Sequence, residues 1–196
     1  MVPVEEIEAC AASHVRLTAI VSGLSDVSIP SRLPDWTVGH VLTHLARNAD
    51  SCVRRLEAAQ AGELVTQYEG GDEGRAAEIA HGAGRPAAEV VADLVASCDR
   101  LDALFPQVTD EVWAGEVMAG SSRRIPATRL AFSRWREVEI HLVDLGLGYE
   151  AAQWPRALVD RQVPELLEEL PERTDPARLM AWALGRGPAP DLAFWG

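Results

Sequence analysis

The sequence predicts a mainly α-helical protein, an antiparallel bundle of four helices with a short β-hairpin and a small C-terminal segment. Apolar residues recur every three to four positions over four long stretches, which is the period of a helix that buries one face. Clusters of glycine and proline separate these stretches. One short stretch alternates instead around Gly120, Ser121 and Ser122, as the two strands of a hairpin do.

The first two helices are predicted within residues 4–22 and 38–61. Between them lies a turn-rich segment, in which either Asp35 or Thr37 can cap the second helix. The apolar face expected for the first helix contains Ile7, Ala11, Val15 and Ala19. The second helix is strongly amphipathic, and its expected buried face contains Val38, Val41, Leu42, Leu45, Ala49, Cys52, Val53 and Leu56.

The remaining elements of the bundle follow in order. A short helix is expected over residues 75–80, a third long helix over 86–105 and the hairpin within 112–125. Pro126 suits the first turn of a fourth long helix, which is expected to stop near Gly146. The third helix directs Val90, Val91, Leu94, Cys98, Leu101 and Leu104 inward, and the fourth is built on Leu130, Phe132, Trp135, Val138 and Leu142.

We therefore expect two parts, a bundle over residues 1–149 and a reduced segment over 150–196 that packs on it. The second part is rich in proline and predicts two short helices, over residues 156–170 and 176–184. The final tail is expected to be ordered only if its apolar side chains dock on the bundle, namely Leu192, Phe194 and Trp195.

Charge and composition exclude several classes of function. The net charge of -12, from 18 basic and 30 acidic side chains, opposes binding to nucleic acid, which needs basic residues against phosphates. Every basic residue is arginine, so a Schiff-base lysine mechanism is excluded. No stretch approaches the roughly 20 apolar residues of a membrane span. The three cysteines, Cys10, Cys52 and Cys98, form no CxxC pair, so a reducing cytoplasm is the expected setting of the protein. Each cysteine is expected to be a buried structural residue.

Two histidines lie one turn apart on the second predicted helix. His44 lies between apolar Leu42 and Leu45, whereas His40 lies in the first turn, within reach of solvent or a cap. Taken alone, each is more typical of a structural histidine than of a ligand.

Glu137 and His141 on the fourth helix change this interpretation, because a spacing of four lets one helix supply two metal ligands. The alternative is a surface ion pair. Apolar neighbours such as Trp135 and Ile140 favour burial, and a buried carboxylate needs a metal or a cation. Glu139 points to the opposite side and is expected to be solvated.

Together His44, Glu137 and His141 would form a set of two histidines and one glutamate, which leaves a zinc position open for catalysis. Asp144 could orient a ligand, although capping its own helix or pairing with an arginine is an equal alternative. Trp36 and Trp135 flank these residues and are candidates for the cavity wall.

At these residues the sequence resembles the mycothiol-dependent maleylpyruvate isomerase family, part of the DinB-like superfamily of metal-binding four-helix bundles. The resemblance lies in residues 36–48, in residues 124–146 with the pattern Arg-Glu-Val-Glu-Ile-His, and in Gly-Arg-Gly at 185–187. It implies zinc held by His44, Glu137 and His141, with Arg186 as the functional arginine. Isomerase members of the family carry a larger α/β C-terminal domain than residues 150–196 provide.

The resemblance further implies that zinc activates the thiol of mycothiol, which adds to a conjugated cis double bond and leaves after rotation. Arg186 would then stabilise the enolate, and Asn48 and Arg75 are further candidates for binding the thiol or an acidic, unsaturated substrate. One alternative is an S-transferase, in which the thiol stays attached to an electrophile. Another is a metal-containing binding protein without activity, which the open metal position disfavours.

Overall fold

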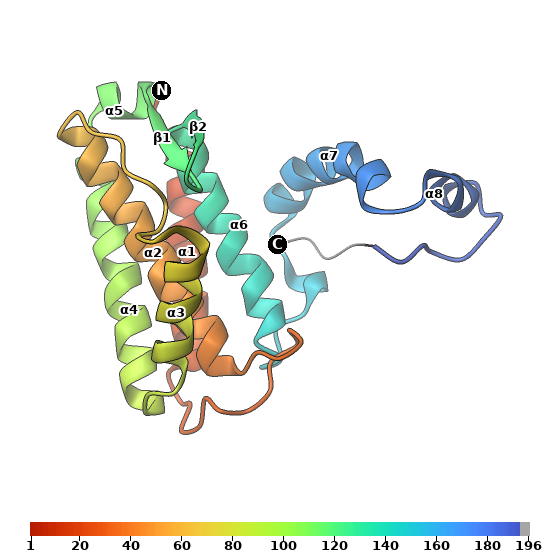
Figure 1. The fold of residues 1–196 in the computed structure, drawn as a ribbon, viewed down its shortest axis with the longest axis horizontal. Coiled ribbons are helices and arrows are strands. Elements are labelled where there is room, and N and C mark those ends of the chain that lie inside the picture. Colours follow the sequence, from red (N-terminus) through yellow and green to blue (C-terminus); the bar gives the residue numbers. More distant parts are fainter. Residues whose placement is uncertain (193–196) are drawn as a thin grey trace. The chain divides into compact units, whose positions relative to one another are not determined.

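The structure, a computed structural model, describes residues 1–192. It is mainly helical and divides into two compact units, Met1–Ala151 and Ala152–Gly196 (Figure 1). The candidate ligands predicted for the metal all lie in the first unit. Phe194 and Trp195, whose docking was considered above, lie outside the described residues.

Four long helices form the core of unit 1 and confirm the predicted bundle. α1 packs on α6 and α4, while α2 packs on α4 and α6, so each long helix contacts two others. The shorter α3 covers the outer side of α2 (Figure 1). The bounds are α1 Val4–Val21, α2 Val38–Gln60, α3 Gly71–Ala83, α4 Ala87–Leu104 and α6 Thr128–Asp144.

Two predicted boundaries were wrong. The short helix expected over residues 75–80 begins four residues earlier, because the acidic Asp72 and Glu73 favour the positive end of a helix and extend its first turn. Pro126 ends a strand instead of starting a helix. Strand pairing continues past it, since the N–H of Ala127 donates to the carbonyl of Gly115 at 3.0 Å.

The predicted hairpin is present between α4 and α6. Its strands are antiparallel, β1 Glu116–Ala119 and β2 Arg123–Pro126. Residues 112–114, which were expected in the hairpin, belong to a short helix, because the side chain of Thr109 caps the N–H of Val112. The short elements before the hairpin are η1 Phe105–Gln107 and α5 Asp110–Ala114.

The predicted buried face of α1 was wrong, since Val15 is 71% exposed. The buried face is a different one, on which polar Ser13 and His14 lie among Cys10, Leu17 and Val21. An alanine-rich helix has a weak apolar pattern, so hydrogen-bond partners on other helices decide which side faces inward. The bundle therefore contains polar groups at its centre.

α2 begins and packs as predicted. Thr37, one of the two proposed caps, accepts from the N–H of His40, and the His40 ring returns a contact to Thr37. His40 is thereby used for capping. The expected apolar face of α2 is buried except at Val53, which is half-buried. Its buried residues are Val38, Val41, Leu42, Leu45, Ala49, Cys52 and Leu56.

Unit 2 begins within the short helix η2 and contains two further helices, which pack on each other. Pro164 and Pro171 lie inside the first of these helices, which continues to residue 173, three residues past the predicted end. The packing of residues 150–196 on the bundle stays a prediction. The bounds are η2 Ala151–Gln153, α7 Arg156–Arg173 and α8 Pro176–Ala183.

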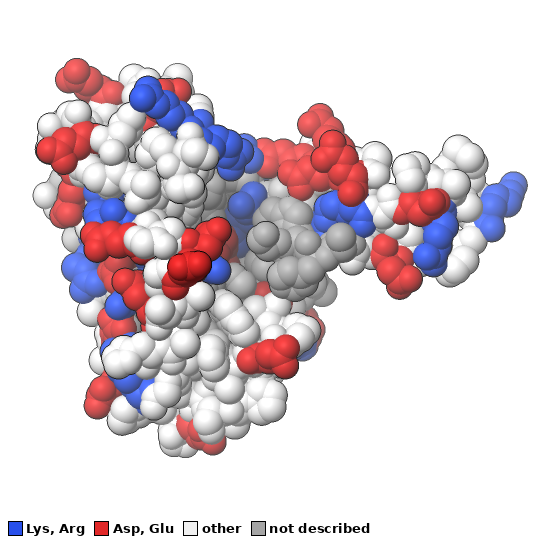
Figure 2. Space-filling view, viewed as in Figure 1, with Lys and Arg blue, Asp and Glu red and all other residues white. Residues whose placement is uncertain are grey.

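The surface of unit 1 carries mixed charge. On the face that Figure 2 shows, acidic side chains lie among the arginines over α2 and α3. No helix in the described part of the chain is long and apolar enough to cross a membrane.

Candidate metal centre

Three residues predicted as ligands meet where α2 packs on α6. Nε2 of His44 lies 2.7 Å from Oε1 of Glu137, and Nε2 of His141 lies 3.6 Å from the same oxygen. All three potential ligand atoms lie within 4.8 Å of one another. The i,i+4 spacing of Glu137 and His141 places both on the side of α6 that faces α2. We call these three residues the His44 triad.

The His44 triad is largely buried, and its members shift one another's pKa. Burial favours the neutral carboxyl of Glu137, but contacts with His141 and His44 outweigh it and hold the pKa well below its usual range. Burial lowers the pKa of His44. Burial would also lower that of His141, but hydrogen bonds to Asp144 and Glu137 raise the pKa of His141 to about 9. An ionised carboxylate is therefore held between two histidine rings.

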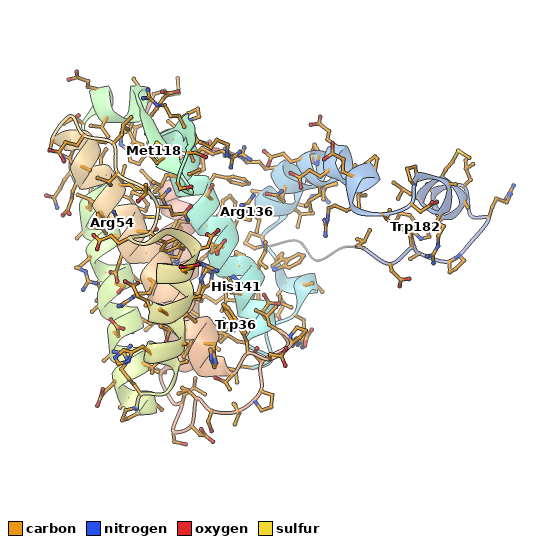
Figure 3. The ribbon with its side chains drawn as sticks, in the orientation of Figure 1. Trp36, Arg54, Met118, Arg136, His141 and Trp182 are labelled. Atoms are coloured by element: carbon orange, nitrogen blue, oxygen red, sulfur yellow. The ribbon has the colours of Figure 1, made fainter. Side chains whose placement is uncertain are left out.

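Two neighbouring side chains orient the triad. Oδ2 of Asp144 lies 2.9 Å from Nδ1 of His141, so the carboxylate holds the ring with Nε2 toward Glu137. The ring of Trp36 lies edge-on to that of His44, with 5.8 Å between ring centroids. The ring of His141 lies 4.8 Å from the ring of His44. Trp36 and His141 are labelled in Figure 3. Trp36 thus packs beside the triad, and its predicted place in a cavity wall stays a prediction.

Arg75 on α3 reaches His44 from the other side. Its Nη2 lies 3.1 Å from Nδ1 of His44, and its guanidinium carbon lies 5.7 Å from the centre of the Tyr68 ring. A glycine makes this approach possible, because a Cβ on Gly82 of α3 would lie 2.4 Å from the side chain of Thr43 on α2. Arg75 was predicted to bind the thiol or substrate, and the structure places it against a triad member.

The other predicted residues have contacts of their own. Asn48, one turn beyond His44, directs its side-chain oxygen to Nη1 of Arg134 at 3.0 Å. Arg186 follows α8 in unit 2, where its exposed guanidinium donates to the carbonyl of Leu184 at 3.3 Å. Trp135 is buried and packs on Phe132, with 6.1 Å between ring centroids. The roles predicted for Asn48 and Arg186 stay predictions.

A second group of potential ligands was missed from the sequence. Nδ1 of His14 lies 2.8 Å from Oδ1 of Asp102, and Nε2 of His14 lies 3.7 Å from Sγ of Cys10. Their ligand atoms also lie within 4.8 Å of one another. The i,i+4 spacing of Cys10 and His14 on α1 was the available signal. We call Cys10, His14 and Asp102 the His14 cluster.

A buried arginine lies against the His14 cluster. Arg134 is 1% exposed, and its Nε lies 3.1 Å from Nε2 of His14. It also donates to the carbonyl of Leu45 at 2.8 Å and to Asn48, and its Nη2 lies 3.5 Å from Sγ of Cys98. A metal ion on these ligands would face a fixed guanidinium, so the electrostatics oppose metal binding there.

The contact with Arg134 also decides the protonation of His14. Burial lowers the pKa of His14, Asp102 and the nearby thiols raise it, and the charge of Arg134 lowers it. An imidazolium would direct a second N–H at the guanidinium, which has only donors. Arginine keeps its charge in proteins and would repel a buried imidazolium. His14 is therefore neutral, with its proton directed at Asp102.

Glu139 was expected to be solvated, and this was wrong, because the residue is completely buried. Its carboxylate accepts hydrogen bonds from Ser13 and Arg16 on α1 and from the hydroxyl of Tyr149 at 2.6 Å. These partners offset the cost of burying the charge. Burial, together with the hydrogen bond to Glu139, raises the pKa of Tyr149. The bonds from Ser13 and Arg16 tie α6 to α1.

The His44 triad fits a catalytic metal ion better than the His14 cluster does. Two imidazole nitrogens and one carboxylate oxygen are a donor set that zinc takes with a further position open. One of these histidines is oriented by a carboxylate, as metal-bound histidines usually are. Fold and site thus define a class, a helical bundle with a candidate divalent-metal centre.

Residues 10–146 match the family model of the mycothiol maleylpyruvate isomerase N-terminal domain, so the chain belongs to this family. The crystal structure of a mycothiol-dependent maleylpyruvate isomerase is similar, with a TM-score of 0.79 and 26% identity over 84% of this chain and 69% of that chain. The structure of a histidine-to-alanine mutant of such an enzyme has a TM-score of 0.79 and 25% identity over the same shares. No curated protein sequence matches. The predicted family is confirmed.

Proposed function

We propose that this protein is a zinc-dependent enzyme that uses mycothiol to isomerise the cis double bond of an unsaturated acid such as maleylpyruvate. One observation carries the proposal, the approach of the three ligand atoms of the His44 triad to within 4.8 Å of one another in the bundle. Family membership supports the choice of thiol and reaction. The similar crystal structure of an enzyme with that activity in its name is further support.

The residues of unit 1 have separate tasks in this proposal. Nε2 of His44, Nε2 of His141 and the carboxylate of Glu137 would hold the ion. Bound there, zinc supplies a Lewis acid that lowers the pKa of a thiol toward neutrality. Asp144 keeps His141 oriented through its 2.9 Å contact. Trp36 packs against His44 and shields that ring from water.

Arginine residues would bind the acid. Addition of a thiolate to the conjugated double bond moves negative charge onto the carbonyl of the substrate, so fixed positive charge nearby favours the reaction. Arg75 contacts the triad through His44. Arg186 remains the candidate that follows from the family motif, and Asn48 is the weaker candidate, because its oxygen is engaged by Arg134.

The direct test is to incubate metal-replete protein with maleylpyruvate, with and without mycothiol. We expect the trans isomer to form only when the thiol is present. A stable thiol adduct in place of the isomer would identify an S-transferase. Metal retention without either product would overturn the proposed enzyme and favour a binding protein.

Replacing a ligand tests the site itself. His44→Ala should lose zinc and all thiol-dependent activity, because two protein ligands hold a catalytic zinc ion poorly. The matched control is His81→Ala, which removes an exposed histidine of α3 and should change neither. Metal analysis by mass spectrometry after dialysis measures the first effect. Full zinc occupancy in His44→Ala would refute the assignment of the ligands.

A further inference from the structure

The two histidines of the His44 triad have neighbours of opposite hydrogen-bonding character. Nδ1 of His141 faces the carboxylate of Asp144, which can only accept. Nδ1 of His44 faces the guanidinium of Arg75 at 3.1 Å, which can only donate. His44 must therefore accept at Nδ1, which leaves its proton on Nε2, directed at Glu137 2.7 Å away.

This arrangement cannot persist when His44 binds a metal through Nε2. Ligation needs the lone pair of Nε2, so the proton of the neutral ring must lie on Nδ1. An N–H at Nδ1 would then oppose an N–H of Arg75. A metal-bound histidine usually donates from this atom to a carboxylate or carbonyl, as the geometry of His141 and Asp144 allows.

We propose that Arg75 holds His44 in the metal-free form and is released from it when the metal binds. The inference rests on the proposed metal site and adds a coupling to it. Arg75 is able to move, because it is only half-buried on α3 and its other described contact is the face of Tyr68, 5.7 Å away. The guanidinium is then free for a carboxylate of the substrate only in the metal-loaded protein.

The coupling makes Arg75 a competitor of the metal. Arg75→Met removes the donor and the charge while keeping an unbranched side chain. The affinity of this variant for zinc should rise about tenfold, because zinc no longer has to break one hydrogen bond. Arg123→Met, on exposed β2, is the matched control and should bind as the wild type does. Calorimetric titration of metal-free protein with zinc measures both.

A spectroscopic measurement separates this role from a structural one. In ¹⁵N spectra of labelled protein, the wild-type His44 ring should carry its proton on Nε2 without metal and on Nδ1 with zinc. Unchanged or weaker zinc binding by Arg75→Met, or a proton on Nδ1 before zinc is added, would overturn the role of Arg75 alone. Absence of zinc binding by wild type and variant alike would overturn the metal site as well.

Discussion

The His44 triad and the His14 cluster differ less in their ligand atoms than in the arginine beside each. Each group has a histidine with a carboxylate, and in each an arginine nitrogen lies 3.1 Å from a ring nitrogen. Arg134 is fully buried and anchored by a backbone carbonyl and an amide oxygen, whereas Arg75 is half-buried on a covering helix.

This difference shows that the spacing of potential ligands does not by itself define a metal site. A fixed buried guanidinium supplies the positive charge and the hydrogen bonds that its neighbours need. A metal cation is then excluded from the same position. A displaceable cation leaves the ligands available. We therefore predict that the His14 cluster stabilises the bundle and that the His44 triad binds metal.

The largest effect should follow from removing the fixed cation. Arg134→Met leaves the Leu45 carbonyl, the Asn48 side chain and Nε2 of His14 without their donor inside the core. We expect the free energy of unfolding to fall by about 3–5 kcal/mol. Urea denaturation measures it.

Arg123→Met makes the same chemical change at an exposed position of the hairpin. Its effect on the free energy of unfolding should stay within about 0.5 kcal/mol. A similarly small loss for Arg134→Met would show that the His14 cluster does not depend on its cation, and the contrast between the two arginines would fail.

The sequence predicted the helices with strong apolar periodicity best. α2 and α4 were placed to within a residue or two, because local pattern and burial agree there. The buried face of α1 was missed, since Ser13 and His14 face inward to meet Glu139 and Asp102, which lie 126 and 88 residues away in the sequence. Periodicity contains no information about such distant partners.

The same limit applies to the candidate site. Glu137 and His141 could be paired from their spacing within one helix, and the structure brings His44 to them from 93 residues away. The contacts of Arg75 and Arg134 could not be predicted. An arginine side chain is long, and the group it reaches depends on how closely neighbouring helices pack, as α3 does at Gly82.

An intermediate effect should follow from adding metal. Zinc at 100 times its dissociation constant should raise the free energy of unfolding of the wild type by about 2.7 kcal/mol, because the ion binds the folded form. Cys10→Ala should show the full gain, although it lies in the His14 cluster. His44→Ala should show none. A gain that disappears in Cys10→Ala would place the ion in the wrong group of ligands.

The smallest effect should come from the carboxylates that orient each histidine. Asp144 faces His141 and Asp102 faces His14, at 2.9 and 2.8 Å, so Asp→Asn is the same change in nearly the same geometry. Asp144→Asn should lower zinc affinity by about 10- to 100-fold, since an amide supports the imidazole less well as a ligand.

Asp102→Asn should leave zinc affinity unchanged, because Arg134 holds the ring nitrogen through which His14 would bind. Competition with a chromophoric chelator for zinc measures the zinc affinity of both variants in the same assay. Equal losses in the two would mean that both histidines are ligands and that a buried guanidinium does not keep a metal ion out of this bundle. A loss confined to Asp144→Asn would leave the neighbouring cation as the property that separates the two groups.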